Sequence, residues 1–141
     1  MRNTNIILGI ADFRKLYGVV SAIRGKRRGL EPHLLRLESE LELATITEAD
    51  RLPEDVVALG STVTILDLDT REERTVSIVF PAELDGSDDR ISILAPLGTA
   101  LIGEKVGATV SCLAPGGVYW FNILEVSGQA ARTPARAEAG T

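Results

Sequence analysis

The apolar residues change their spacing once along the chain, near Pro53. Before this point they recur at a helical period, and after it β-branched residues alternate with polar ones. A helical period buries one stripe of a helix, whereas alternation buries one face of a strand. The sequence therefore predicts an α+β chain with helices in residues 1–50 and a sheet domain in residues 51–127. The Ala-, Arg- and Gly-rich tail, residues 128–141, is predicted to be disordered.

Two apolar seams in the first fifty residues predict a short antiparallel helical hairpin, which is a small coiled coil. Both seams have a 3-4-3 spacing, in Phe13, Leu16, Val20 and Ile23 and in Leu34, Leu37, Leu41 and Ala44. Gly25 and Gly29 end the first helix, and Pro32 suits the first turn of the second. Gly9 is a weak N-cap, with Asp12 in the first turn, where a carboxylate meets free N–H groups. Each arm of about fifteen residues is about 22 Å long at 1.5 Å per residue.

The charges divide sharply between the two helices. Residues 1–30 carry seven basic and one acidic side chain, and residues 31–57 carry two basic and eight acidic ones. Opposite charges favour the pairing of the helices, but exposed ion pairs contribute only about 0 to 1 kcal/mol each, so the apolar seams supply the stability. The whole chain has a net charge of −5. An acidic protein is a poor candidate for coating duplex DNA, and we expect no sequence-specific DNA binding.

The remainder predicts four or five antiparallel strands with one short helix. Residues 63–69 and 74–80 form the first hairpin, with its turn at residues 70–73. An acidic loop at residues 83–90 precedes a short strand at residues 91–94. Pro96 then begins a helix that ends at Gly103, and strands near residues 106–112 and 118–126 complete the sheet.

The chain has few residues suited to enzyme chemistry. Cys112 is the one cysteine and His33 the one histidine, which excludes a disulfide framework, a multi-thiolate metal site and a Ser-His-Asp or Cys-His catalytic centre. We interpret His33 as structural and Cys112 as a core residue. Asp67 and Asp69 are assigned to a strand face and a turn rather than to Mg²⁺. We therefore predict neither a cofactor nor an enzymatic activity, and no nucleotide-binding loop is present.

No apolar run approaches the roughly twenty residues of a membrane span, and the N-terminus lacks a signal sequence. The expected compartment is the cytoplasm, with no membrane partner. The most polarised local feature is the turn of the predicted hairpin, with Arg24, Lys26, Arg27 and Arg28. A solvated turn and a contact to phosphate or to an acidic protein are equally weighted interpretations of this tip, and no aromatic residue lies between its charges to stack bases.

Several blocks in the second part of the chain resemble a known family. They are LGSTVTI at residues 59–65, EERT at 72–75, ISI at 91–93, APLGTALIG at 95–103 and APGG at 114–117. Together they resemble the C-terminal domain of the Gre transcript-cleavage factors. LPEDVV at residues 52–57 and VFPA at residues 79–82 are more similar to the Rnk branch of that family, named for the regulation of nucleoside diphosphate kinase.

The resemblance implies an FKBP-like sheet domain with a coiled-coil arm, and binding at the secondary channel of bacterial RNA polymerase. The globular domain would dock at the channel rim and the arm would point inward. The candidate rim contact comprises the end of a strand and the start of the short helix, which are Ala95, Pro96, Leu97, Gly98, Thr99 and Ala100.

In Gre factors a longer arm carries acidic residues at its tip, which help to hold the catalytic Mg²⁺. Residues 25–30 of this chain contain no carboxylate, and a cation site needs several oxygen ligands. The resemblance therefore implies a regulator of transcription elongation that competes with Gre-type factors in the channel without stimulating cleavage.

Two other functions remain open from the sequence. The FKBP-like fold suggests a peptidyl-prolyl isomerase, but such a site needs an aromatic-lined pocket, and alternation sends Tyr119, Trp120 and Phe121 to both faces of one strand. The Rnk name suggests a direct contact with nucleoside diphosphate kinase. No residue offers a mechanism for that contact, and an indirect effect through transcription is equally consistent.

Overall fold

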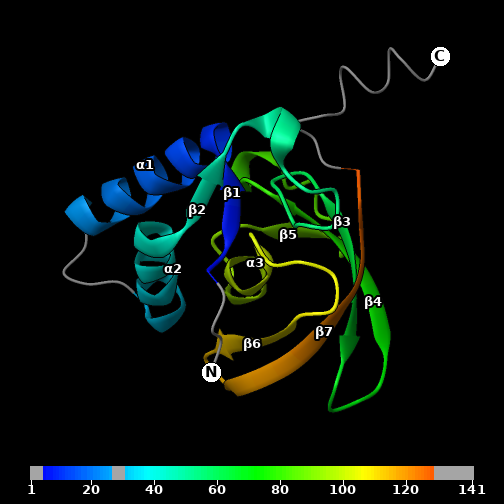
Figure 1. Ribbon diagram of the computed structural model, residues 1–141. Helices are drawn as coiled ribbons and strands as arrows, with labels where there is room; N and C mark the ends of the chain where they lie inside the picture. The colour runs from blue at the N-terminus through cyan, green and yellow to red at the C-terminus, as the bar shows by residue number, and fades with distance from the viewer. Residues whose placement is uncertain (1–4, 27–30, 129–141) are drawn as a thin grey trace.

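The computed structural model describes residues 5–26 and 31–128 (Figure 1). The tail from residue 129, where disorder is predicted, lies outside the described residues. In chain order the elements are β1 (Ile7–Gly9), α1 (Ile10–Lys26), α2 (Pro32–Leu43), β2 (Thr45–Thr47), a 3-10 turn (Ala49–Arg51), β3 (Thr62–Asp67), β4 (Glu73–Val79), a second 3-10 turn (Pro81–Glu83), β5 (Arg90–Ser92), α3 (Pro96–Leu101), β6 (Thr109–Ala114) and β7 (Gly117–Ser127). The predicted α+β class, with a helical hairpin before a sheet, is confirmed.

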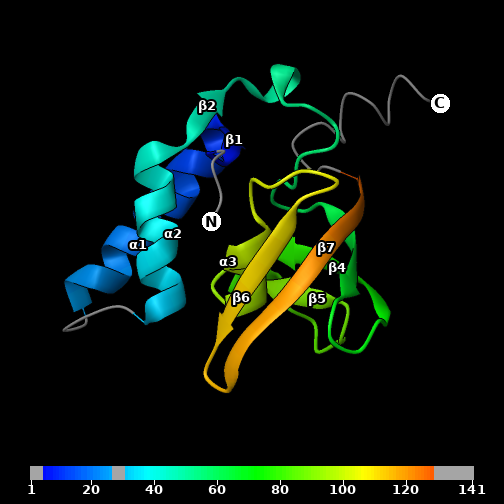
Figure 2. The ribbon, with the colours of Figure 1, turned by 60° about the horizontal axis from the view of Figure 1, so that its bottom comes forward.

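The two helices form the predicted hairpin through the predicted seams. Leu16 and Val20 of α1 are buried, and so are Leu34, Leu37 and Leu41 of α2. Figures 1 and 2 show α2 returning from α1 with its axis inclined to that of α1. On its other side α2 lies against α3 and β6. The hairpin and the sheet therefore share one apolar core, and α2 is the element that belongs to both.

Arg36 holds α2 to the free edge of the sheet. Ser111 of β6 pairs with Trp120 of β7, and the Trp120 carbonyl accepts a hydrogen bond from the Leu68 N–H on the β3 side (3.0 Å). The backbone groups of Ser111 therefore point away from β7, toward the edge. There Arg36 donates from Nη1 to Ser111 Oγ (2.8 Å) and from Nη2 to the Ser111 carbonyl oxygen. An open strand edge is thereby closed by a side chain of the hairpin.

A small parallel sheet of β1 and β2 joins the two ends of the hairpin, and the sequence does not predict it. Ile7 pairs with Thr45, and the Ile7 N–H donates to the carbonyl oxygen of Gly103 (3.0 Å). Ile6 and Leu8 are buried on either side of Ile7. Because each strand has only three residues, neither produces a measurable period in the sequence.

The main sheet has the strand order β5-β4-β3-β7-β6. Three of its pairings, β4 with β3, β3 with β7 and β7 with β6, are antiparallel as predicted. The edge strand β5 instead runs parallel to β4. Residues 80–89, which include a 3-10 turn, return the chain to the level of Ser77, so β5 runs in the same direction as β4. An antiparallel hairpin would use a much shorter turn.

Two turns and one core residue agree with the sequence-based predictions. Asp67 Oδ1 accepts hydrogen bonds from the N–H groups of Asp69 (2.8 Å) and Thr70 (3.2 Å), so the Asp67 carboxylate stabilises the β3–β4 turn. Gly103 follows α3 with φ of +78°, the conformation expected of a glycine that ends a helix. Cys112 is buried within the core, as predicted.

The start of α3 packs closely on the end of β5 at Gly98. A Cβ at this position would collide with the carbonyl oxygen of Ser92 and would lie 3.0 Å from the Ile93 Cα. Both obstacles are backbone atoms, so they cannot rotate away. Gly18 lies on the exposed side of α1, and a Cβ there would meet no neighbouring element within 4 Å.

The same substitution should therefore have opposite effects at the two glycines. We expect Gly98→Ala to lower the free energy of unfolding by about 2 kcal/mol, since overpacking forces backbone shifts. Gly18→Ala should raise the free energy of unfolding by about 0.5 to 1 kcal/mol, because alanine restricts the unfolded chain and favours the helix. Urea unfolding of the full chain measures both. Equal effects of the two substitutions would contradict the close packing of α3 on β5.

Candidate partner-binding site

The tip of the hairpin is partly occupied by an internal ion pair. Arg24 of α1 donates to the Glu38 carboxylate of α2 from Nε (2.8 Å) and from Nη2 (2.6 Å). This two-point contact raises the pKa of Arg24 and lowers the pKa of Glu38, chiefly through the hydrogen bonds. Arg24 is therefore engaged in holding the two helices together. The side chain of Lys26, together with Arg27 and Arg28, lies outside the described residues.

The candidate rim segment, residues 95–100, is mostly buried. Leu97, Gly98, Thr99 and Ala100 are buried, whereas Ala95 and Pro96 are partly exposed at the start of α3. Thr99 donates through its hydroxyl to the Pro96 carbonyl oxygen (2.9 Å) and through its N–H to that of Ala95 (3.0 Å). Both hydrogen bonds serve the first turn of the helix. In this structure only Ala95 and Pro96 of the six candidates have surface for a partner to touch.

The reason for this burial is the position of α3 inside the curl of the sheet. Figure 2 shows α3 behind β6 and β7, with α2 beside it. All residues of α3 except Thr99 are apolar, and five of the six are buried, which indicates contacts on all sides of this short helix. The sequence pattern Ala-Pro-Leu-Gly-Thr-Ala-Leu-Ile already had this character, which could have predicted a buried helix.

His33, in the first turn of α2, lies next to the rim segment. Its Nε2 is 3.0 Å from the carbonyl oxygen of Leu94, and since a carbonyl only accepts hydrogen bonds, Nε2 is the donor. The ring is buried, which supports a structural role. A groove of about 370 Å³ opens beside it between the start of α2 and the β6–β7 turn. It is lined by Glu31, Pro32, His33, Leu113, Ala114, Pro115, Gly117 and Val118.

Sequence reasoning missed this groove because its two walls are about eighty residues apart in the chain. The described lining has no phenylalanine, tyrosine or tryptophan, and its ionisable side chains are His33, whose Nε2 donates to Leu94, and Glu31, whose carboxylate is 4.0 Å from the same nitrogen. A largely apolar groove with a few polar groups can bind a side chain of a partner. The isomerase hypothesis, which needs aromatic walls, gains no support from the groove.

Asp12 joins α1 to the sheet domain. Its Oδ2 accepts a hydrogen bond from the backbone N–H of Leu59 (3.0 Å), and the side chain is buried. The sequence predicts that this carboxylate accepts hydrogen bonds from N–H groups of its own helix. In the structure it accepts one from a backbone N–H 47 residues away. Burial raises the pKa of Asp12, while the hydrogen bond from Leu59 and the charge of Lys15 act in the opposite direction.

The described geometry is a short helical arm attached to a curled sheet, with the partly exposed Ala95 and Pro96 beside α2. Within residues 5–26 and 31–128, no group of three or more His, Cys, Asp or Glu side chains is placed to hold a metal ion. None of the helices in the described ranges has both the length and the apolar content to span a bilayer.

Comparison with known proteins identifies the family. The family model "Transcription elongation factor, GreA/GreB, C-term" matches residues 52–128. The transcription elongation factor GreA of Azorhizobium caulinodans is 41% identical over 96 residues, which are 68% of this chain and 61% of that protein. GreA of Clostridium botulinum (strain Eklund 17B / Type B) is 40% identical over 96 residues, which are 68% of this chain and 60% of that protein.

A solved structure extends the similarity to the arm. The prokaryotic transcription elongation factor GreA/GreB from Nitrosomonas europaea is 31% identical, with a TM-score of 0.72 over 89% of this chain and 99% of that one. The chain belongs to the GreA/GreB transcription elongation factor family. It spans about 60% of the length of the two GreA relatives. Its place in the Rnk branch stays a prediction, and these relatives are described as elongation factors rather than as kinase regulators.

The buried Asp12 carboxylate makes a pH-dependent prediction. Its pKa in the folded chain exceeds the unfolded value of about 3.8, so its stabilising contribution is complete below that value and is lost as the pH rises through the folded pKa. Asp12→Asn keeps an oxygen acceptor for Leu59 but carries no charge. We expect the Asn variant to gain stability relative to the wild type as the pH is raised from 4 to 7, in urea unfolding at each pH.

Asp12→Ala is the matched control, because it removes the acceptor as well as the charge. It should lower the free energy of unfolding by about 1 to 3 kcal/mol, since the Leu59 N–H is left without its partner. A difference between wild type and Asp12→Asn that does not change with pH would show that this carboxylate does not titrate differently in the folded chain.

Proposed function

We propose that this protein binds bacterial RNA polymerase at the secondary channel and excludes Gre-type cleavage factors, without stimulating transcript cleavage itself. The observation that carries the proposal is the short arm of a chain whose sheet domain belongs to the GreA/GreB family. With 17 and 12 residues, α1 and α2 are about 25 and 18 Å long at 1.5 Å per residue. Because α2 packs against α3 and β6, the free length of the arm is shorter still.

The charges of the arm also argue against cleavage. Residues 25–30 at the turn contain three basic residues and no carboxylate. Asp12 is buried at the other end of α1, Glu38 is paired with Arg24, and Glu31 is the one carboxylate that directly follows the turn. Within the described residues these carboxylates form no group of three that could hold a metal ion. A Mg²⁺ ion needs several free oxygen ligands and is repelled by a cationic turn. Such an arm can occupy a channel, but it cannot supply ligands to a metal ion there.

The contact with the polymerase would be made by Ala95 and Pro96, beside the groove that His33 borders. Both residues begin α3, and this place is rigid because the backbone of α3 is enclosed by the core. A rigid, partly exposed apolar pair next to an apolar groove fits a contact that depends on shape and apolar burial.

Competition on the polymerase tests this function. Purified full-length protein should bind bacterial core RNA polymerase and should reduce cleavage stimulated by a Gre factor, as the concentration ratio of the two factors is raised. Alone it should leave backtracked transcripts uncleaved. Cleavage by this protein would refute the argument from the arm. A failure to bind at tens of micromolar would refute the polymerase as partner.

Substitutions at the start of α3 test the contact. Pro96→Asp should weaken binding to the core polymerase at least tenfold while the chain stays folded, because an acidic residue suits the first turn of a helix. Leu84→Asp is the control, since Leu84 is an exposed apolar residue in the β4–β5 connection, outside α3 and outside the groove lining, and it should bind as the wild type does. Unchanged affinity of Pro96→Asp would remove Ala95 and Pro96 from the interface. Leu97→Asp is unsuitable for this purpose, since it places a charge in the core and should cost about 3 kcal/mol or more of stability.

A further inference from the structure

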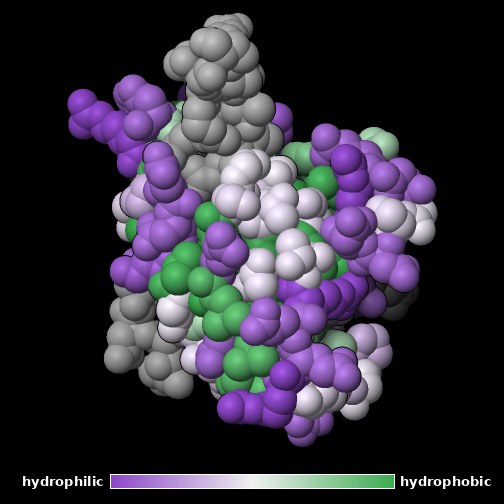
Figure 3. Space-filling model, turned by 90° about the vertical axis from the view of Figure 1, so that its right-hand side faces the viewer, coloured by the Kyte–Doolittle hydropathy of each residue, from purple (hydrophilic) through white to green (hydrophobic). Residues whose placement is uncertain are grey.

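The outward side of the main sheet is an uncovered surface with exposed apolar residues. In β7, Phe121 and Ile123 pack on the core, so the alternate residues Val118, Trp120 and Asn122 point outward. Val118 and Trp120 are about half exposed, at 52% and 49%. Figure 3 views the side on which β4 and β7 lie and shows hydrophobic residues in a band between hydrophilic ones. A group of exposed apolar side chains on an uncovered sheet face marks a contact surface.

The outward residues of the neighbouring strands follow from the strand register. Leu113 pairs with Val118, and Leu66 pairs with both Asn122 and Glu73. Thr64 pairs with Glu125 and with Thr75. We call the whole set the outer sheet face: Thr62, Thr64 and Leu66 of β3, Glu73, Thr75 and Ser77 of β4, Thr109, Ser111 and Leu113 of β6, and Val118, Trp120, Asn122 and Glu125 of β7.

The charged residues of the outer sheet face that form no ion pair are both acidic. They are Glu73 and Glu125, both exposed. Arg90 of β5, which pairs with Ser77, is itself bound to Asp85 (3.5 Å), and the Arg36 guanidinium is bound to Ser111 at the edge of the face. Neither Glu73 nor Glu125 forms an ion pair in the described part of the chain. The surface therefore fits a partner that brings basic side chains together with apolar ones.

One helix of the same chain has these properties. The side of α1 that borders its seam presents Ile10, Arg14 and Tyr17, spaced at i, i+4 and i+7. Ile10 and Tyr17 are 40% and 54% exposed, and the Tyr17 ring is held by stacking on Phe13, with ring centroids 5.8 Å apart. Arg14 has no ion pair within the described residues. We call Ile10, Arg14 and Tyr17 the outer stripe of α1.

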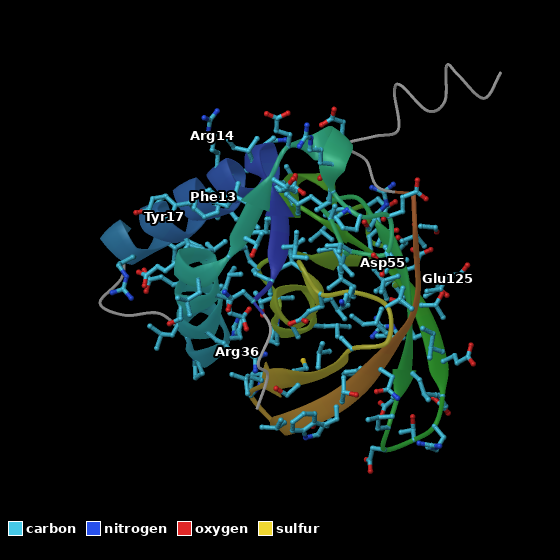
Figure 4. All side chains as sticks on the ribbon, in the orientation of Figure 1. Phe13, Arg14, Tyr17, Arg36, Asp55 and Glu125 are labelled. Atoms are coloured by element: carbon cyan, nitrogen blue, oxygen red, sulfur yellow. The ribbon has the colours of Figure 1, made fainter. Side chains whose placement is uncertain are left out.

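The two surfaces cannot meet within one molecule. In Figure 4, Arg14 and Tyr17 lie on α1 at one side, and Glu125 lies at the opposite side. Two copies, however, can bring them together. We propose that the outer stripe of α1 in one copy packs on the outer sheet face of a second copy, with Arg14 beside Glu125 and Glu73 and with Ile10 and Tyr17 against Leu66 and Trp120.

The shapes of the two surfaces suit this contact. A helix packed on an open sheet face is one of the standard ways to bury an apolar stripe. Gly18 and Ala11 flank the stripe and let the helix approach closely, since Gly18 has open space around it. The contact joins two different surfaces, so it is heterologous and forms either a reciprocal pair or an open series of copies. Its electrostatic part weakens as salt is added.

Sedimentation equilibrium of the full chain tests the proposal. The weight-average mass should rise above the 15.1 kDa of one chain as the concentration is raised, and less steeply at 0.5 M NaCl. Arg14→Glu and Glu125→Arg should each weaken the association about tenfold. The double variant, with both changes in one chain, exchanges the charges and should restore the association to within about threefold of wild type.

Matched controls change the same charges elsewhere. Arg51→Glu and Glu42→Arg alter exposed residues outside both surfaces and should associate as the wild type does. Urea unfolding of each variant verifies that it is folded. A constant mass of one chain at all concentrations up to 1 mM overturns the proposal. Association that survives both single charge reversals, or that the double variant fails to restore, overturns the pairing of these two surfaces.

The self-association has a consequence that rests on the proposed function. Because α1 is part of the arm, a copy whose α1 is covered by another copy could not insert that arm into the polymerase. Trp120→Ser should weaken self-association and leave binding of a dilute sample to the polymerase unchanged. Since sedimentation is measured without polymerase, a failure of the proposed function would not affect that result.

Discussion

The structure depends on the burial of α2 between α1 and the sheet domain. A curled sheet needs its inner face covered, and α3, with six residues, covers only part of that face. The seam of α2 supplies the rest, and the same seam holds α1. The hairpin is therefore part of the fold of the sheet domain rather than an appendage to it. Arg36 and the β1–β2 pair reinforce the same junction with polar contacts.

This dependence explains which features could be predicted from the sequence. The seams of α1 and α2, the turn after Asp67 and the end of α3 at Gly103 all arise from spacing or from residue types with local preferences, and they are predictable for that reason. The β1–β2 pair, the parallel direction of β5 and the contact of Arg36 with Ser111 arise from residues that are far apart in sequence. Local patterns contain no information about such pairings.

The residues of the candidate site also differ in how far their roles can be predicted from the sequence. Family resemblance pointed to residues 95–100 as one contact, yet burial leaves surface only at Ala95 and Pro96. The rest of the motif holds α3 in place: Gly98 allows the close approach to Ser92, and Thr99 closes the first turn. A motif can thus be interpreted as a binding site when most of its residues serve the fold. Burial separates the two roles, and sequence alone cannot, because the covering element α2 comes from a distant part of the chain.

Some charged residues of the two helices are paired inside the molecule, and others remain unpaired on its surface. The acidic residue Glu38 faces the hairpin and is matched by Arg24, so this part of the charge asymmetry is neutralised inside the molecule. Arg14 has no such match, and it lies on the side of α1 that the core leaves free. The sheet shows the reverse, with Glu73 and Glu125 on its free side and apolar residues on its covered side. The charges on the covered faces are paired inside the molecule, whereas the unpaired charges on the two free faces have opposite signs. A partner meets the free faces first, so their charges determine which partners bind.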